Sequence, residues 1–225
     1  MDENIINWDH ENDWHLYVNI PTKLIADHMF DILREQSVLE LGAFDGWFTK
    51  HILDYTNRVT CLEFNQMACE TLRSKFGNKI TVVAEDFHSS IRTIGQFDAV
   101  ILYGVLYHSC APLQILEDTA NIVKPTYMLL ECWDKVQHPD SCVFNREIPN
   151  IPGNRYSDSP TCGLVISLGK NLIISALNSL GYIKQREFVL DEHPMRQAAH
   201  SNMDQVAIVE DFKYRGIYML FKRCL

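Results

Sequence analysis

A glycine-containing turn after an apolar run is the part of this sequence best suited to hold a ligand. The run Val38–Leu41 leads into Gly42, Gly46 follows four residues later, and apolar residues then recur at helical spacing. Such a turn lets a ligand approach the backbone, and the free N–H groups at the start of a helix favour a carboxylate or phosphate. The spacing differs from the Gly-x-Gly-x-x-Gly fingerprint of dinucleotide-binding enzymes.

Other polar groups stand where further apolar runs end. Glu63 ends the run 58–63, Asp86 follows the run 79–84, and His108 lies a few residues beyond the run 97–102. Parallel sheets bind ligands at the carboxyl ends of their strands. We therefore expect these side chains to lie along one edge, provided that the runs form parallel strands.

The order of the elements predicts such a sheet. Strand alternates with helix over the first 130 residues, which implies right-handed crossovers, and the last two strands lack a helix between them, which predicts an antiparallel hairpin. The region 133–169 is interrupted by prolines and glycines and is expected to be an irregular excursion. Expected strands are 38–41, 58–63, 79–84, 97–102, 127–131, 182–190 and 214–223. Expected helices are 24–35, one from about 47, 66–76, 89–94, one from 112 with core residues Leu113, Leu116, Ala120 and Val123, and 172–180.

These features together resemble the class I S-adenosylmethionine-dependent methyltransferases. Glu40 with the turn from Gly42 to Gly46 looks like the first motif of that family, and Phe97–His108 looks like its fourth strand and the loop that follows. The resemblance covers residues 37–132 and extends more loosely to 225. It implies an α/β, doubly wound, mainly parallel seven-stranded sheet with an antiparallel closing strand, and S-adenosylmethionine as the cofactor.

The resemblance also implies roles for individual residues. It puts the turn beside the methionine portion of the cofactor, Glu63 at the ribose hydroxyls as a bidentate acceptor, and Asp86 at the adenine. The segment from Tyr103 to His108 lies under the transferable methyl group in such enzymes. The implied cofactor-binding residues are Glu40, Gly42, Ala43, Phe44, Gly46, Glu63, Phe64, Asp86, Phe87, Tyr103 and Gly104, and the implied catalytic residues are His108 and Tyr107.

Several of these residues have a plainer alternative. Glu63 is alternatively a solvated strand end, and Asp86 a helix cap. His108 is either a general base or a residue that shapes the pocket through a hydrogen bond. His88 is interpreted as a loop residue.

The predicted reaction is methyl transfer to an oxygen or nitrogen of a small polar acceptor. The segment 1–19 and the excursion 133–169 are expected to form the acceptor pocket. One alternative is methyl or alkyl transfer to a tRNA base, because Gly104–His108 resembles the wobble-uridine tRNA modifying enzymes, although Ser109 and Cys110 stand where basic residues are expected. Another is a catalytically silent scaffold that keeps the fold. Pocket candidates are Trp133, Asp134, His138, Arg146, Arg155, Tyr156 and Asp158, with a core position as the alternative for Trp133. Trp8, Trp14 and Tyr17 either belong to a frayed or partner-bound terminus, which is the favoured interpretation, or close over the ligand.

Composition sets the remaining expectations. The chain has 225 residues, of which 47% are hydrophobic, enough for a sizeable core. The net charge of −9 disfavours broad nucleic-acid binding. The seven cysteines form no Cys-x-x-Cys pair, so no metal site is expected. The sequence shows no secretion signal and no membrane span, so the chain is expected to be cytoplasmic. The expected parts are an extension with a cap helix (1–36) and the methyltransferase domain (37–225). The sequence gives no oligomeric state.

Overall fold

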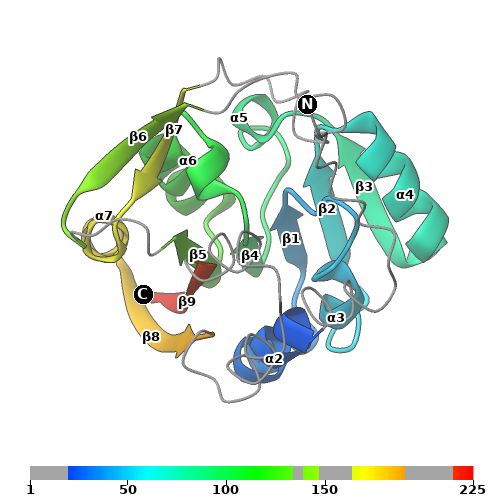
Figure 1. The fold of residues 1–225 in the computed structure, drawn as a ribbon. Coiled ribbons are helices and arrows are strands. Elements are labelled where there is room, and N and C mark those ends of the chain that lie inside the picture. The colour runs from blue at the N-terminus through cyan, green and yellow to red at the C-terminus, as the bar shows by residue number, and fades with distance from the viewer. Residues whose placement is uncertain (1–19, 134–138, 147–163, 191–214, 225) are drawn as a thin grey trace, which may run out of the picture.

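A seven-stranded sheet lies at the centre of the molecule (Figure 1). The structure, a computed structural model, describes residues 20–133, 139–146, 164–190 and 215–224. The main sheet contains β1 (Val38–Leu41), β2 (Val59–Glu63), β3 (Ile80–Ala84), β4 (Ala99–Leu102), β5 (Tyr127–Trp133), β8 (Tyr182–Val189) and β9 (Arg215–Arg223). A smaller sheet pairs β6 (Cys142–Arg146) with β7 (Leu164–Leu168).

The strand order of the main sheet is β3-β2-β1-β4-β5-β9-β8. Neighbouring strands are parallel from β3 to β5, whereas β9 runs antiparallel to both β5 and β8. The chain reverses its direction of travel across the sheet between β1 and β4, which is where doubly wound sheets bind their ligands. The predicted fold class is confirmed, including the antiparallel strand.

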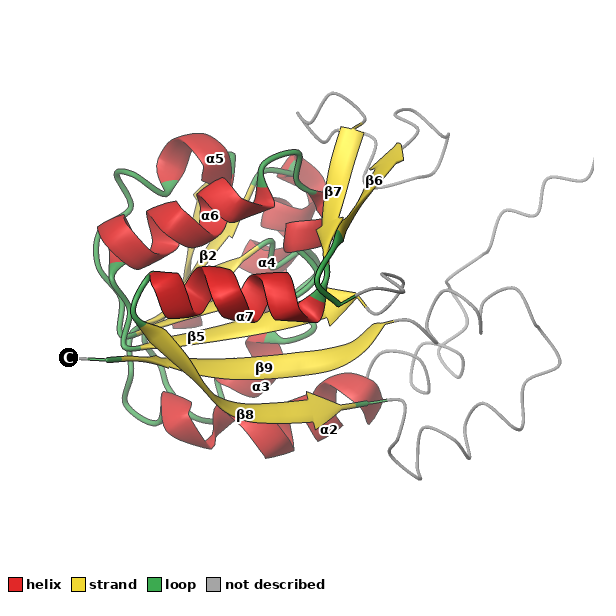
Figure 2. Ribbon diagram, turned by 90° about the vertical axis from the view of Figure 1, so that its left-hand side faces the viewer, coloured by secondary structure: helices red, strands yellow, loops and turns green. Residues whose placement is uncertain are grey.

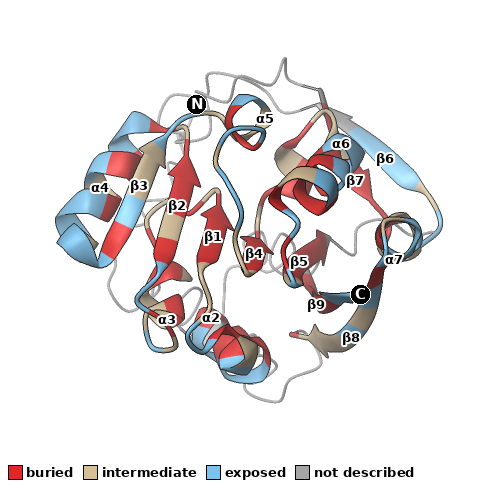
Figure 3. Ribbon diagram, turned by 180° about the vertical axis from the view of Figure 1, so that it is seen from behind, coloured by how far each residue is buried: buried red, intermediate tan, exposed pale blue. Residues whose placement is uncertain are grey.

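Helices cover both faces of this sheet, with α2 and α3 on one side and α6 and α7 on the other (Figure 2). Side chains of a strand alternate between the faces: Val38 packs on the α2 side, and Leu39 on the α6 side. The central strands are therefore buried on both faces (Figure 3). None of the described helices is both long and apolar enough to cross a membrane. In the described ranges the α-helices are α2 (Ile20–Met29), α3 (Thr49–Ile52), α4 (Gln66–Phe76), α5 (Phe87–Ser90), α6 (Pro112–Asp118) and α7 (Lys170–Ser179). The short 3-10 helices are η2 (Phe30–Leu33), η3 (Gly77–Lys79) and η4 (Leu106–His108), and η5 (Thr119–Val123) is a π-helix.

Three local predictions were wrong. Leu113 is 51% exposed, and Ile115 is buried in its place, because α6 presents positions 115 and 116 to the sheet and η5 presents position 120. The helix predicted at 89–94 begins earlier, at Phe87, because the Asp86 side chain accepts a hydrogen bond from the His88 N–H and starts the helix there.

The third wrong prediction concerns the excursion at 133–169. Ten of its residues form the β6–β7 hairpin, since the apolar runs on either side of the prolines pair with each other. The Ile166 N–H of β7 donates to the Ser109 carbonyl at 2.9 Å, so the hairpin is attached to the loop that follows β4. The residues between these two strands lie outside the described part.

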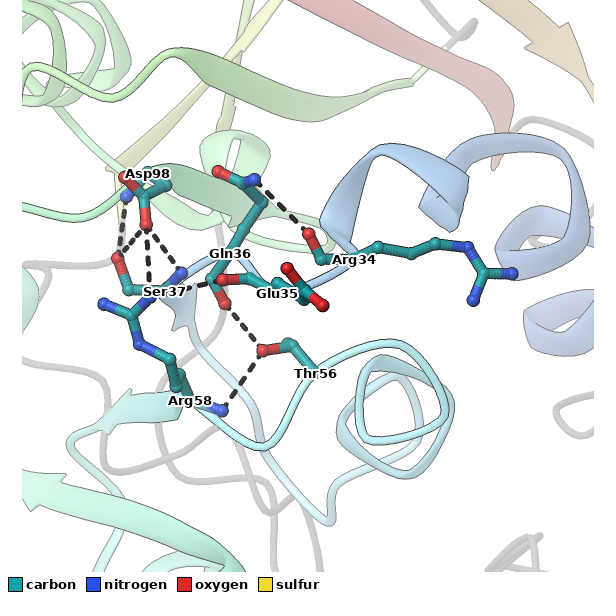
Figure 4. A network of polar contacts seen from close by, with 7 residues as sticks. All are labelled: Arg34, Glu35, Gln36, Ser37, Thr56, Arg58 and Asp98. Atoms are coloured by element: carbon teal, nitrogen blue, oxygen red, sulfur yellow. Dashed lines mark hydrogen bonds and ion pairs between the residues drawn. The ribbon is translucent and has the colours of Figure 1, made fainter.

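A polar network fixes the amino-terminal edge of the sheet, opposite the carboxyl ends of its parallel strands (Figure 4). Asp98 Oδ2 accepts hydrogen bonds from the Ser37 N–H at 2.8 Å and the Ser37 hydroxyl at 2.6 Å. The Thr56 hydroxyl donates to the Gln36 carbonyl at 2.7 Å. The contacts of Ser37 lower the pKa of Asp98, and this carboxylate thereby holds the start of β1 beside β4.

Replacing Asp98 by Asn should lower the free energy of unfolding by about 1–2 kcal/mol at pH 7, because two hydrogen bonds lose their charged acceptor. The pKa of Asp98 is depressed in the folded state, so its contribution is fully present above pH 3.8 and is lost as the pH falls below that value. Urea denaturation of wild type, D98N and the exposed-site control E117Q at pH 7 and pH 3 tests this. An equal loss at both pH values would contradict it.

Candidate functional site

The turn after β1 contains three residues with left-handed backbone conformation. Gly42, Phe44 and Gly46 have φ angles of 65°, 48° and 81°. A side chain at Gly42 would meet Val105 Cγ2 at 2.9 Å, and one at Gly46 would meet the ring of Phe76 at 2.4 Å. Both glycines are therefore required for packing as well as for backbone conformation. A cofactor contact at Gly42, Gly46 or the buried Ala43 stays a prediction.

Glu63, at the end of β2, holds this turn in place. Its side chain is only 4% exposed, so the alternative of a solvated strand end is wrong. Oε2 accepts from the Phe44 N–H at 2.9 Å, and Oε1 accepts from the Asn65 N–H at 2.9 Å. Burial raises the pKa of Glu63, while the N–H groups of Asn65, Phe44 and Phe64 oppose the rise. Three donors leave about one of a carboxylate's four acceptor positions for a ligand, which is fewer than bidentate binding of a diol requires.

Glu40 lies behind the turn, one residue before the end of β1. Its Oε2 accepts from the Thr49 hydroxyl at 2.6 Å and from the Cys61 thiol at 3.7 Å, both inside the protein. Burial raises the pKa of Glu40 to about 7, and burial likewise raises the pKa of Cys61. These contacts make Glu40 an anchor between β1, β2 and α3, and its predicted contact with a cofactor remains a prediction.

Asp86 and Phe87 begin α5 immediately after β3, the strand next to β2. Asp86 caps the helix, as the plainer alternative predicted, and a contact with an adenine stays a prediction. The ring of Phe87 packs against the core and beside the ring of His88, with centroids 4.5 Å apart. His88 lies in α5, so the prediction of a loop residue is wrong, and its Nε2 lies 3.2 Å from the buried Ser109 hydroxyl. This contact joins α5 to the loop after β4.

The segment after β4 brings the predicted catalytic residues to the same edge. Gly104 has a φ angle of 73°, and Tyr107 is buried while His108 is half-buried. The rings of Tyr107 and His108 lie 4.6 Å apart. Tyr103 is buried in the core: its ring contacts Phe30, Phe48 and Tyr218.

Glu131, near the end of β5, is a site residue that the sequence reasoning missed. Its side chain is 5% exposed, and Oε2 accepts from the Gly104 N–H at 2.8 Å and the Tyr107 hydroxyl at 3.5 Å. The signal was available, because Glu131 follows an apolar run just as Glu63 does. The structure thus brings together the turn, Glu63, the Tyr103–His108 segment and Glu131 along the carboxyl edge of β2, β1, β4 and β5.

Most of the predicted pocket residues fall outside this description. For Trp133 and Arg146 only the backbone is described. No group of three or more His, Cys, Asp or Glu side chains in the described ranges is arranged to hold a metal ion. The residues outside the described ranges are Trp8, Trp14, Tyr17, Asp134, His138, Arg155, Tyr156 and Asp158.

Comparisons with known proteins agree with this arrangement. Residues 39–130 match a family model described as a methyltransferase domain. The N-terminal domain of EvdMO1, solved with SAH bound, is 18% identical and has a TM-score of 0.62, over 91% of this chain and 81% of that chain. The putative methyltransferase solved with the Haloferax volcanii Trm112 methyltransferase activator is 14% identical, with a TM-score of 0.64 over 95% and 93%.

A third solved structure has the same fold. The Burkholderia thailandensis 1,6-didemethyltoxoflavin-N1-methyltransferase is 13% identical, with a TM-score of 0.59 over 93% of this chain and 79% of that chain. At such identities the likeness shows the fold alone. A search of curated protein sequences found no match.

The raised pKa of Glu40 predicts how stability depends on pH. The folded protein holds this proton more tightly than the unfolded chain, so stability falls as the pH rises from 4.5 to about 7. Glu40→Gln imitates the protonated acid. Its free energy of unfolding should equal that of wild type at pH 5 and exceed it at pH 8 by on the order of 3 kcal/mol. Urea denaturation at both pH values measures this, and a variant that is less stable than wild type at pH 8 would refute it.

Proposed function

We propose that this protein transfers a methyl group from S-adenosylmethionine to an oxygen or nitrogen of a small polar acceptor. The match of residues 39–130 to a methyltransferase domain model and the strand order of the sheet support this proposal. The observation that carries the proposal is the buried Glu63 carboxylate, which holds the glycine turn of β1 and keeps an acceptor position for a ligand hydroxyl. The residues present therefore fit an adenosine-containing cofactor at this point. When bound, this cofactor supplies a methyl carbon activated by the positive sulfonium.

The protein's part in such a reaction is alignment, exclusion of water and removal of a proton. His108 is half-buried, lies beside Tyr107 and follows β4. We therefore propose that His108 accepts the proton that the methyl acceptor loses. Tyr107 positions the acceptor. The β6–β7 hairpin, attached at Ser109, bounds the acceptor side of the site.

Two other functions are less well supported. Transfer to a tRNA base would need cations for phosphate contacts, whereas the chain carries a net charge of −9 and has Ser109 and Cys110 after His108. A silent scaffold has no physical need for a buried acid that keeps a free acceptor position. The proposal is tested by incubating the protein with S-adenosylmethionine and metabolite pools and searching by mass spectrometry for a product one methylene heavier. Absence of any such product across broad pools would count against it.

Glu63→Gln should weaken S-adenosylmethionine binding about 10- to 100-fold, because a hydrogen bond to a charged group is replaced by a neutral one. Isothermal titration calorimetry of wild type and E63Q measures the change, with E117Q as the matched surface control. Unchanged affinity in a folded E63Q protein would remove Glu63 from the cofactor site.

His108→Ala should lower turnover about 100-fold or more, the contribution typical of a general base, and leave cofactor affinity within about twofold. The measurement is single-turnover methyl transfer with the acceptor found above, together with calorimetry. Turnover equal to that of wild type would leave His108 no part in the chemistry.

A further inference from the structure

The crossover from β3 to β4 leaves part of one sheet face without a helix. Its helix α5 has four residues, about 6 Å of length, whereas the five-residue strand β3 spans roughly 16 Å. α5 begins shortly after β3 ends and lies at the arrowhead end of β2 (Figure 3). The amino-terminal halves of β2 and β3 are therefore open on this face, whereas the eleven-residue α4 covers the other face.

Polar side chains occupy the open part of this face. Thr60 and Thr81 are paired in the register of β2 and β3, and Thr60 is also paired with Leu39, whose side chain lies on the α6 side. Arg58 and Lys79 come two residues earlier, directly before these strands begin, so strand alternation puts their side chains on the same face. Two cations and two hydroxyls thus form one patch on neighbouring strands, which lie about 4.8 Å apart.

These four residues line a cleft of about 210 Å³ at the amino-terminal edge of the sheet. Phe97, in the loop that leads to β4, also lines it, as do the exposed Asn57 and Asn78. None of the described residues that line the cleft is an acid. Pockets for drug-sized ligands have volumes of about 300–1,000 Å³, so this cleft suits one small polar group.

The hydrogen-bond donors of the cleft are largely unused. Lys79 and the two asparagine and two threonine side chains make no hydrogen bond or ion pair with any residue in the described ranges. Arg58 is 60% exposed, and its Nη1 donates to the Glu35 carbonyl at 3.2 Å and lies 3.9 Å from Asp98 Oδ2, which leaves most of its five N–H groups available (Figure 4). Asp98 offsets the charge of Arg58, whereas the charge of Lys79 has no such partner. The cleft is therefore positive in a chain with a net charge of −9.

We propose that this cleft binds the phosphate group of a small metabolite. A phosphate group presents three strong acceptor oxygens, which match the guanidinium of Arg58, the ammonium of Lys79 and the two threonine hydroxyls. A carboxylate has two oxygens in one plane and would use fewer of these donors. The cleft lies at the opposite edge of the sheet from the Gly42–Gly46 turn, so it is separate from the proposed methyl-transfer site and the inference does not depend on that function.

The charge of the cleft fits one phosphate group better than a nucleic-acid strand. A strand is held through contacts to about 6–10 phosphates, whereas two cations line this cleft. The net charge of −9 opposes a longer contact with a polyanion. The partner is therefore a phosphorylated small molecule.

The test is a titration of the wild-type protein with inorganic phosphate, and then with glycerol phosphate, at constant ionic strength, followed through its amide NMR signals. The signals of residues 57–60 and 78–81 should shift saturably with both probes, while those of residues 42–46 stay in place. Lys79→Gln should weaken binding about tenfold, because one charge-assisted hydrogen bond is lost. Lys23→Gln, which removes an exposed charge from α2, is the matched control and should bind within about twofold of wild type.

Thr81→Val removes one hydroxyl and no charge, so it should weaken binding by a smaller factor, about threefold. If K79Q fails to fold, T81V carries the comparison with K23Q. Equal affinity in the cleft variants and K23Q, or no saturable shift at residues 57–60 and 78–81, would overturn the inference. Shifts confined to residues 42–46 would also overturn it. Shifts of the cleft signals with a short RNA oligonucleotide but with neither phosphate probe would overturn it in favour of nucleic-acid binding.

Discussion

The hydrogen bond between the Glu63 carboxylate and the Phe44 N–H is the interaction on which the site depends. Phe44 is a non-glycine residue in the left-handed region, a conformation that costs on the order of 1 kcal/mol or more and persists only where its surroundings hold it. Glu63 supplies that restraint from the next strand, and the ring of Trp47 packs against Phe44 from the following turn. The backbone of the turn is thus set by a buried acid on the neighbouring strand.

The rest of the fold keeps the two partners of that bond in register. The hydrogen bonds of Glu40 with Thr49 and Cys61 join β1 to α3 and β2. At the amino-terminal edge of the sheet, the hydrogen bond between Asp98 and Ser37 joins the start of β1 to β4. The missing side chains of Gly42 and Gly46 let Val105 and Phe76 close over the turn. Beyond β4, Glu131 repeats the arrangement, with a buried carboxylate that accepts the backbone N–H of Gly104, a glycine with a φ angle of 73°.

Much of this arrangement could be predicted from the sequence, because each strand is a short apolar run and each turn has its own signal. The helix 66–76 was predicted to the residue, since Gly77 and Asn78 give a stop signal, and in the structure the Asn65 side chain caps its start. The strand order and the internal partners of Glu40 and Glu63 could not be predicted, because they arise from long-range packing. The β6–β7 strands were missed because the prolines between them dominate the local pattern. Glu131 was missed although it follows an apolar run as Glu63 does, because the family resemblance gave no role to an acid at the end of the fifth strand. The predicted contacts with S-adenosylmethionine, the catalytic part of His108 and the resemblance to tRNA-modifying enzymes stay predictions.

The central claim is that Glu63 and the Gly42–Gly46 turn together hold an adenosine-containing cofactor at the carboxyl edge of β1 and β2. A crystal structure of the protein with S-adenosylhomocysteine tests it most directly. The account predicts a ribose hydroxyl about 2.7 Å from a Glu63 carboxylate oxygen, with Phe44 still bonded to that side chain. A nucleoside bound elsewhere, with the Glu63 oxygens engaged only by backbone N–H groups, would contradict it.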